Sequence, residues 1–262
     1  MQYQTIIGPS LSRVTAISCL LLTISIAPAI AASLTFAQYV QADGAQQQWS
    51  ITTTAGITTV QASGAVAFTF SGVPGLPFAG ARNATFTLNA TSSQPGNCGV
   101  ACGAGDSFVQ PGYAGTFSFI DTLLGTNLLS GTFAVTGSPA TTGAQFSSSV
   151  GSSGGSFNAS ATAGNLNQLI MTSAYLNLAG QTQENASWGL SSLTPNFSTG
   201  AVTAGRAFPA AGPFSAAGSG TFSSNPGPIV TPEPDSMALI GGGLLAIGLL
   251  RRKMHSKAKV SM

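Results

Sequence analysis

The central part of this sequence, residues 33–230 (the body), carries almost no charge. It contains no lysine and no histidine, and its two arginines and four carboxylates give a net charge of −2. A surface that binds nucleic acid needs many lysine and arginine side chains to neutralise phosphates. Nucleic-acid binding is therefore excluded for the body. Its six charged residues are Asp43, Arg82, Asp106, Asp121, Glu184 and Arg206.

The lack of histidine and lysine also removes most kinds of catalysis from the body. The single histidine, His255, stands in the C-terminal tail. Catalytic triads, cysteine–histidine pairs and histidine zinc sites need an imidazole, and Schiff bases need a lysine amine. Paired carboxylates remain, because a glycoside hydrolase uses two carboxyl groups about 5–9.5 Å apart. Asp106 and Asp121 are the pair considered, although both stand where turn residues are expected. We predict no catalytic residue, no cofactor and no metal site.

Only three cysteines are present, and each can be assigned from its surroundings. Cys19 lies inside an apolar run, whereas a lipid-attachment cysteine should end that run. Cys98 and Cys102 stand among glycines in the segment CGVAC. In an exported chain this spacing favours a small-loop disulfide, and a metal site or free thiols are the alternatives.

Low charge is combined here with a hydrophobic content of 44% and 15 phenylalanines, so the body can form a core. Apolar and hydroxyl-bearing residues alternate, which predicts strands. Val66, Phe68 and Phe70 share one face of such a strand, and Phe86 and Leu88 share a face of the next. One apolar face per strand is what two packed sheets require. We therefore predict an all-β body, a β-sandwich of jelly-roll-like or Ig-like type.

The body also contains a recurring tripeptide and a segment with few apolar residues. The tripeptide Gly-Thr-Phe recurs at 115–117, 131–133 and 220–222 without a regular period, so no solenoid is expected. We interpret it as a turn followed by a strand. The segment 147–164 is poor in apolar residues and is predicted to be a mobile loop or an edge excursion.

Aromatic residues offer a second class of function, that of a carbohydrate-binding module. Trp49, Trp188, Tyr39, Tyr113 and Tyr175 can form a platform on which sugars stack, provided that the rings are exposed. Core packing and cross-strand pairing are the more common roles of such rings.

The N-terminus, residues 1–32, has the three regions of a secretory signal peptide. Arg13 supplies the positive charge, and the run from Val14 to Ile26 is apolar. Small residues follow, with cleavage expected after Ala31 or Ala32. The apolar run is too short to span a membrane comfortably. We predict a signal helix that is removed by signal peptidase after export through the Sec machinery.

The C-terminus has three elements in a fixed order. Pro232, Glu233 and Pro234 form a stiff segment that cannot be helical. Residues 237–250 are uncharged and apolar, and as a helix they reach about 21 Å, short of a hydrocarbon core of about 30 Å. Snorkelling side chains and local thinning of the bilayer can cover the deficit. The predicted short transmembrane helix is closed by the basic cluster Arg251, Arg252 and Lys253.

This order of motif, helix and basic cluster closely resembles the PEP-CTERM sorting signal. The resemblance covers about the last 25 residues and assigns Pro232, Glu233 and Pro234 to recognition, with Asp235 where the usual pattern has a small residue. It implies a sorting signal over 231–254 and a basic cytoplasmic tail over 255–262. An ordinary tail anchor is the alternative.

The resemblance also implies partners and a location. PEP-CTERM proteins are exported proteins of Gram-negative bacteria, and a membrane enzyme of transpeptidase type, exosortase, is thought to recognise their motif. The family is linked to exopolysaccharide and biofilm. We expect an exported surface or matrix protein, anchored transiently in the inner membrane through residues 237–250. Its body would associate with extracellular polysaccharide or with copies of itself.

Overall fold

The computed structural model describes residues 33–98, 102–134, 144–161, 168–200 and 210–230. These residues form β-strands joined by turns, and the strands carry the alternation of buried and exposed side chains expected of one apolar face. The all-β prediction is therefore confirmed. The strands are β1 (Leu34–Gln41), β2 (Trp49–Thr54), β3 (Ile57–Phe70), β4 (Arg82–Ser92), β5 (Ser107–Asp121), β6 (Asn127–Phe133), β7 (Ala144–Ser149), β8 (Gly155–Ala161), β9 (Leu169–Thr172), β10 (Leu176–Asn177), β11 (Gln183–Thr194), β12 (Phe214–Asn225) and β13 (Ile229–Val230).

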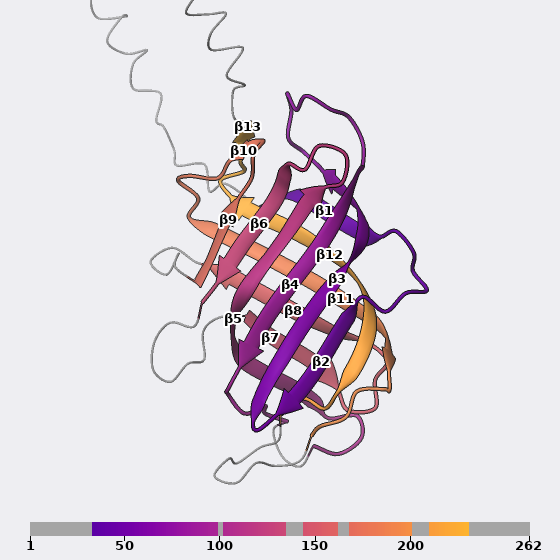
Figure 1. Ribbon diagram of the computed structural model, residues 1–262. Coiled ribbons are helices and arrows are strands. Elements are labelled where there is room, and N and C mark those ends of the chain that lie inside the picture. The colour runs from indigo at the N-terminus through magenta and orange to yellow at the C-terminus, as the bar shows by residue number, and fades with distance from the viewer. Residues whose placement is uncertain (1–32, 99–101, 135–143, 162–167, 201–209, 231–262) are drawn as a thin grey trace, which may run out of the picture. The chain divides into compact units, whose positions relative to one another are not determined.

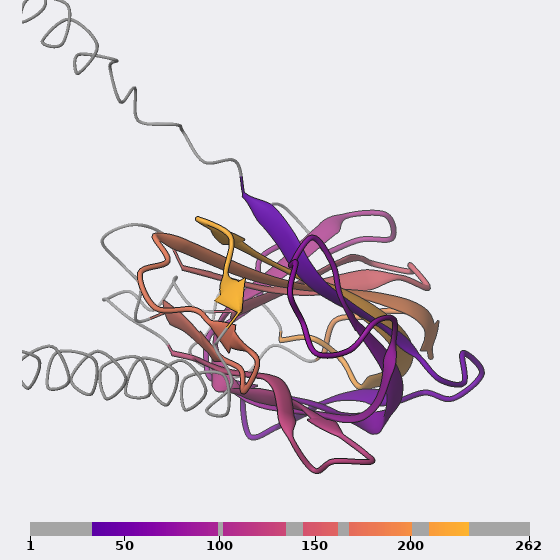
Figure 2. The ribbon, with the colours of Figure 1, turned by 90° about the horizontal axis from the view of Figure 1, so that it is seen from above.

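Eight of these strands close into an antiparallel barrel. Its order is β1–β3–β4–β5–β7–β8–β11–β12, and β12 pairs again with β1. In Figure 1 the near strands, including β3 and β4, cross over the far strands, including β8 and β11. Seen from above, the strands surround a common interior (Figure 2). β2 pairs with both β3 and β12, beyond the stretch in which β1 pairs with them. β6 pairs with β5, and β9 pairs with β6, so these two strands extend the sheet from β5.

The predicted sandwich is therefore wrong. A sandwich and a barrel require the same alternation, because each strand has one apolar face in both. They differ in whether the first and last strands pair, and here Leu34 to Val40 pair with Ser219 to Ser224. Strand β5 also bends, since its register shifts between Gln110 and Tyr113, where Gly112 has a φ of 76°. Such a bulge increases the curvature of the strand. β5 can therefore pair with β4 and β6 over one part of its length and with β7 over the other.

Aromatic rings fill the barrel interior. The rings of Phe86 and Phe119 stack at 4.7 Å between centroids, and Trp188 meets Phe117 edge to face at 5.3 Å. Both tryptophans of the chain have no exposed surface. Side chains pack the interior of an eight-stranded barrel, so these rings make its core.

Two local predictions are corrected by the strands. The segment 147–164, expected to be a mobile loop or edge, holds the end of β7 and all of β8, and both lie inside the closed ring. Ser147 and Ser156 lie on the face opposite to buried Phe146 and Phe157, and their hydroxyl groups bond at 2.7 Å. The Gly-Thr-Phe tripeptides lie within β5, β6 and β12 rather than at turns.

The described part of the chain ends in a small two-stranded sheet, formed by β10 and β13. β13 pairs antiparallel with β10, with Leu176 opposite Val230 and Asn177 opposite Ile229. Within the described residues, no helix has the length and apolar character needed to span a membrane. The predicted signal helix and the predicted helix over 237–250 lie outside the described residues.

Candidate functional site

One end of the barrel, here called the exit end, brings together the β5–β6 loop (122–126), the β9–β10 connection and β13. Asn127, directly after the loop, accepts a hydrogen bond at 3.0 Å from the backbone N–H of Ala174. β10 begins two residues later and holds β13. The last described residue, Val230, therefore leaves the barrel beside this loop.

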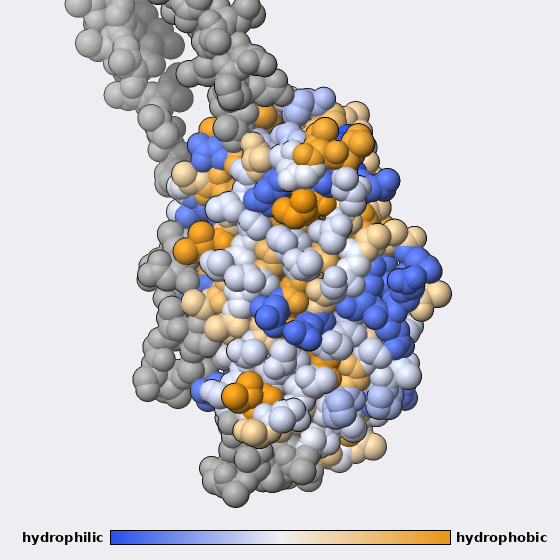
Figure 3. Space-filling view, viewed as in Figure 1, coloured by the Kyte–Doolittle hydropathy of each residue, from blue (hydrophilic) through white to orange (hydrophobic). Residues whose placement is uncertain are grey.

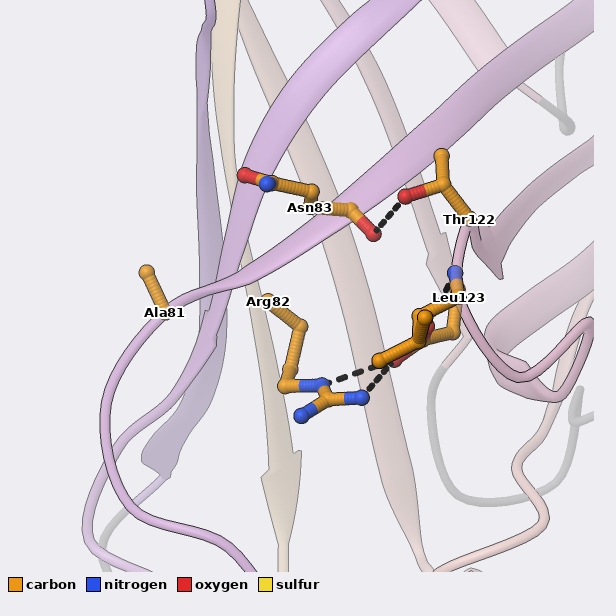
Figure 4. A pocket seen from close by; sticks show the side chains of 6 residues that line it. Ala81, Arg82, Asn83, Thr122 and Leu123 are labelled. Atoms are coloured by element: carbon orange, nitrogen blue, oxygen red, sulfur yellow. Dashed lines mark hydrogen bonds and ion pairs between the residues drawn. The ribbon is translucent and has the colours of Figure 1, made fainter.

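An ion pair shapes the β5–β6 loop. Asp121 ends β5, and its Oδ2 accepts from Nε and Nη2 of Arg82 in β4, both at 2.7 Å (Figure 4). Its other oxygen, Oδ1, accepts from the backbone N–H groups of Leu123 at 2.8 Å and Leu124 at 3.0 Å. Asp121, expected to be a turn residue, is the last residue of β5, and its side chain holds the turn that follows while it also forms the ion pair.

The electrostatics of this pair are those of a structural contact. The hydrogen bond from Arg82 lowers the pKa of Asp121, helped by the two loop N–H groups and opposed by desolvation. The same hydrogen bond raises the pKa of Arg82. The guanidinium also lies 5.2 Å from the centre of the Phe78 ring. Arg82 and Asp121 line a surface hollow of about 370 Å³ but are already engaged with each other.

Glu184 is the second residue of β11 and carries a buried carboxyl group at the exit end. Its side chain borders a pocket of about 500 Å³ whose wall is mostly apolar. Desolvation by burial raises the pKa of Glu184 to about 7, and a hydrogen bond from the Met171 N–H to Oε2 at 3.1 Å opposes that rise. Near pH 7 this carboxyl group is therefore divided between its neutral and charged forms. The wall includes Ile170, Met171, Leu176, Leu178, Ile229 and Val230.

We expect Glu184 to make stability depend on pH. Its pKa is raised on folding from 4.5 to about 7, so the folded form binds more protons than the unfolded form between these values. The free energy of unfolding should fall as pH rises through this window, by about 3 kcal/mol. Glu184→Gln keeps an oxygen for the Met171 N–H and removes the titration. Urea unfolding from pH 4.5 to 8 should give a smaller decline for this variant, and parallel curves would contradict the assignment.

Other residues considered from the sequence are placed as follows. Cys98 and Cys102 form the predicted disulfide, with Cα atoms 5.0 Å apart. Pro232, Glu233 and Pro234 lie outside the described residues, as do Arg251, Arg252 and Lys253.

The paired-carboxylate option fails for the two residues considered. Asp106 immediately precedes β5 and accepts a hydrogen bond at 2.8 Å from the N–H of Gly103, as a turn residue does. Asp121 is the last residue of β5. At about 3.3 Å per residue, the 15 residues of β5 extend over at most about 50 Å, and even with the bend in this strand the two carboxyl groups at its ends are too far apart for one glycosidic bond.

The aromatic platform is not formed either. Trp49, Trp188 and Tyr113 have no exposed surface, and Tyr39 is 1% exposed. Tyr175 is half-buried against the rings of Phe78 and Phe70. These rings belong to the core or to its cover, so the exposed-aromatic version of the carbohydrate-binding hypothesis is wrong.

Sequence reasoning missed the Arg82–Asp121 pair and the burial of Glu184. No local signal pointed to the first, because Arg82 and Asp121 are 39 residues apart in the sequence and meet only through the pairing of β4 with β5. Glu184 stands at a position whose neighbours alternate between the two faces of β11, with Ala186 and Trp188 pointing inward. The same alternation assigns Glu184 to the interior.

The described chain thus defines an aromatic-filled, nearly uncharged barrel whose last strand leads directly into the C-terminal segment. Comparison with family models identifies that segment: residues 230–253 match the PEP-CTERM protein-sorting motif. The chain therefore carries the C-terminal sorting signal of exosortase substrates and is an exported protein, anchored in the membrane until it is sorted. No curated protein and no solved structure matches the chain.

Proposed function

We propose that this protein is a non-enzymatic component of the cell surface or extracellular matrix, released by exosortase and associated with extracellular polysaccharide. The signal peptide would direct it through the Sec machinery, and residues 237–250 would hold it in the inner membrane until processing. The observation that carries the proposal is the sorting motif at 230–253, which begins at the strand that closes the exit end.

The outer surface of the barrel supports association with polysaccharide. Hydroxyl and amide side chains pair across neighbouring strands, as Thr87 does with Ser118 at 2.8 Å and Ser187 with Asn158 at 2.6 Å. Such groups hydrogen-bond to sugar hydroxyls as well as to each other. Among the described residues charged side chains are few, so this association should persist at high ionic strength.

The test replaces Pro232, Glu233 and Pro234 by alanine in a host that contains exosortase. We expect the unaltered protein in the extracellular polysaccharide fraction, in low and in high salt, with an intact mass that lacks the C-terminal segment. The triple variant should stay in the membrane fraction with its C-terminus uncut, because the enzyme no longer recognises it.

The matched control is the double variant Lys257→Ala and Lys259→Ala, which alters tail charge outside the matched motif. This control should be processed like the unaltered chain. Release of the triple variant at the normal rate would exclude the motif as the sorting signal. Loss of the processed protein from the polysaccharide fraction in high salt would contradict the uncharged mode of association.

A further inference from the structure

The exit end exposes large apolar side chains close to the point where the chain continues into the sorting motif. Leu123 is 81% exposed and Leu124 59% in the β5–β6 loop, and Ile229 in β13 is 65% exposed. Ile170 in β9 is 50% exposed and borders the same pocket as Ile229. Figure 3 shows hydrophobic side chains at the upper end of the described region, where Figure 1 places this loop. A group of this kind marks a surface that contacts a partner or a membrane.

The loop presents its leucines because other contacts hold it in shape. Asp121 binds the N–H groups of both Leu123 and Leu124, and Thr122 donates from its hydroxyl to the carbonyl oxygen of Asn83 at 3.1 Å. The loop backbone is therefore fixed to β4 and β5 while the two leucine side chains point away from the core. Apolar groups held outward at a loop tip need little ordering to enter a new environment.

The length of the connection decides which partner is near. β13 is held to β10 up to Val230, and six residues, from Thr231 to Ser236, separate it from the apolar segment 237–250. Six residues span at most about 20 Å when fully extended. While segment 237–250 lies in the bilayer, the exit end is therefore confined to the layer of lipid headgroups and the water just above it.

The charges at this end oppose contact with a lipid surface only weakly, because Arg82 and Asp121 neutralise each other and burial raises the pKa of Glu184 to about 7, which leaves its carboxyl group partly neutral. Arg82, the one cation that the described residues contain, is paired with Asp121 and lies over Phe78. The Asp121 side chain is only 1% exposed and the Arg82 side chain 23%, so a paired and mostly covered charge lowers the desolvation cost of approach. The large side chains that face outward there include Leu123, Leu124, Ile170 and Ile229, which gain by leaving water.

We propose that, before exosortase releases the protein, the exit end of the barrel rests on the outer surface of the inner membrane, with Leu123 and Leu124 inserted among the lipid headgroups. The inference rests on the proposed function, because it requires segment 237–250 to be in the bilayer. Apolar side chains in such interfacial contacts enter by about 5–10 Å. The contact presents the motif, directly after Val230, at the depth where a membrane enzyme works.

The test places a tryptophan at the loop. The full chain carrying Leu123→Trp is exported in a bacterial host without exosortase, purified in detergent and reconstituted into vesicles of phosphatidylethanolamine and phosphatidylglycerol. Half of the samples contain lipids with brominated acyl chains, which quench tryptophan on contact. Trp49 and Trp188 are fully buried in the barrel and give a constant background. We expect the emission of the added tryptophan to shift to the blue and to be lost in brominated vesicles.

The matched control is Ile57→Trp, because Ile57 is 50% exposed and lies at the β2–β3 turn, at the opposite end of β3 from the exit end. Its emission should stay red and unquenched. Quenching at both positions, or at neither, would overturn the inference. A blue shift at position 123 without quenching would mean that a second copy covers the loop, and this also overturns it.

Flotation of the vesicles separates this inference from the function on which it rests. If the chain fails to float with the vesicles, segment 237–250 does not insert, and the proposed anchoring fails together with the inference. If the chain floats and Leu123→Trp is not quenched, only the membrane contact fails. Far-UV circular dichroism of each variant should match the unaltered chain, since both positions are exposed.

Discussion

Replacing Trp188 by alanine should destabilise the barrel by about 3–5 kcal/mol, the usual cost of removing a large buried aromatic side chain. Trp188 has no exposed surface and lies at the centre of the aromatic core. Its ring centroid is 5.3 Å from that of Phe117, 5.6 Å from that of Phe157 and 5.8 Å from that of Phe222. These partners come from β5, β8 and β12, so the cavity would loosen both sides of the closed sheet.

Urea unfolding followed by far-UV circular dichroism measures this effect, and Trp49 remains as a fluorescent probe. Leu123→Ala is the control, because an exposed side chain should change stability by less than about 0.5 kcal/mol. A Trp188→Ala variant with unchanged stability and reduced binding to polysaccharide would show that the ring faces a ligand instead. That result would restore the carbohydrate-binding hypothesis that the burial of Trp188 removes.

The strands could be predicted from the sequence because alternation is a local signal. Phe86 and Leu88 point inward in β4 as expected, and Phe117 and Phe119 do so in β5. Closure could not be predicted, because it depends on the pairing of β1 with β12, whose residues are far apart in sequence. The hairpin of β7 and β8 was hidden by its composition, since its inner face holds only one phenylalanine in each strand and is otherwise filled by alanine and other small residues.

At the candidate site, too, features within a short stretch of sequence could be predicted, and features that depend on the pairing of distant segments could not. The Cys98–Cys102 disulfide and the sorting motif could be predicted because each is contained in a short stretch of sequence. The Arg82–Asp121 pair depends on the register of β4 against β5, which sets Ala84 opposite Asp121. No local pattern encodes that register. The exposure of Leu123 and Leu124 likewise follows from the ion pair and the loop it holds.

The second large effect on stability is expected at Gly115, the glycine of the first Gly-Thr-Phe tripeptide. Gly115 lies in β5 opposite Ala90 of β4. A Cβ atom at Gly115 would press against the carbonyl oxygen of Asn89 and lie 2.6 Å from the Ala90 Cα. Both are backbone atoms, so relief requires β4 and β5 to separate. The recurring glycine thus leaves room for a close approach between strands, a role that the turn interpretation missed.

Gly115→Ala should therefore destabilise the barrel by about 3 kcal/mol, the upper end of the cost of overpacking. Gly189→Ala is the matched control, because Gly189 also lies within a strand, β11, and its nearest neighbour would be the Ser219 hydroxyl at 4.0 Å. Alanine there restricts the unfolded chain, so stability should stay the same or rise by up to about 1 kcal/mol. Thermal and urea unfolding should show that the two substitutions change the free energy of unfolding in opposite directions, or by very different amounts. Equal losses would mean that glycine matters in these strands through backbone freedom and not through the close approach of β4 to β5.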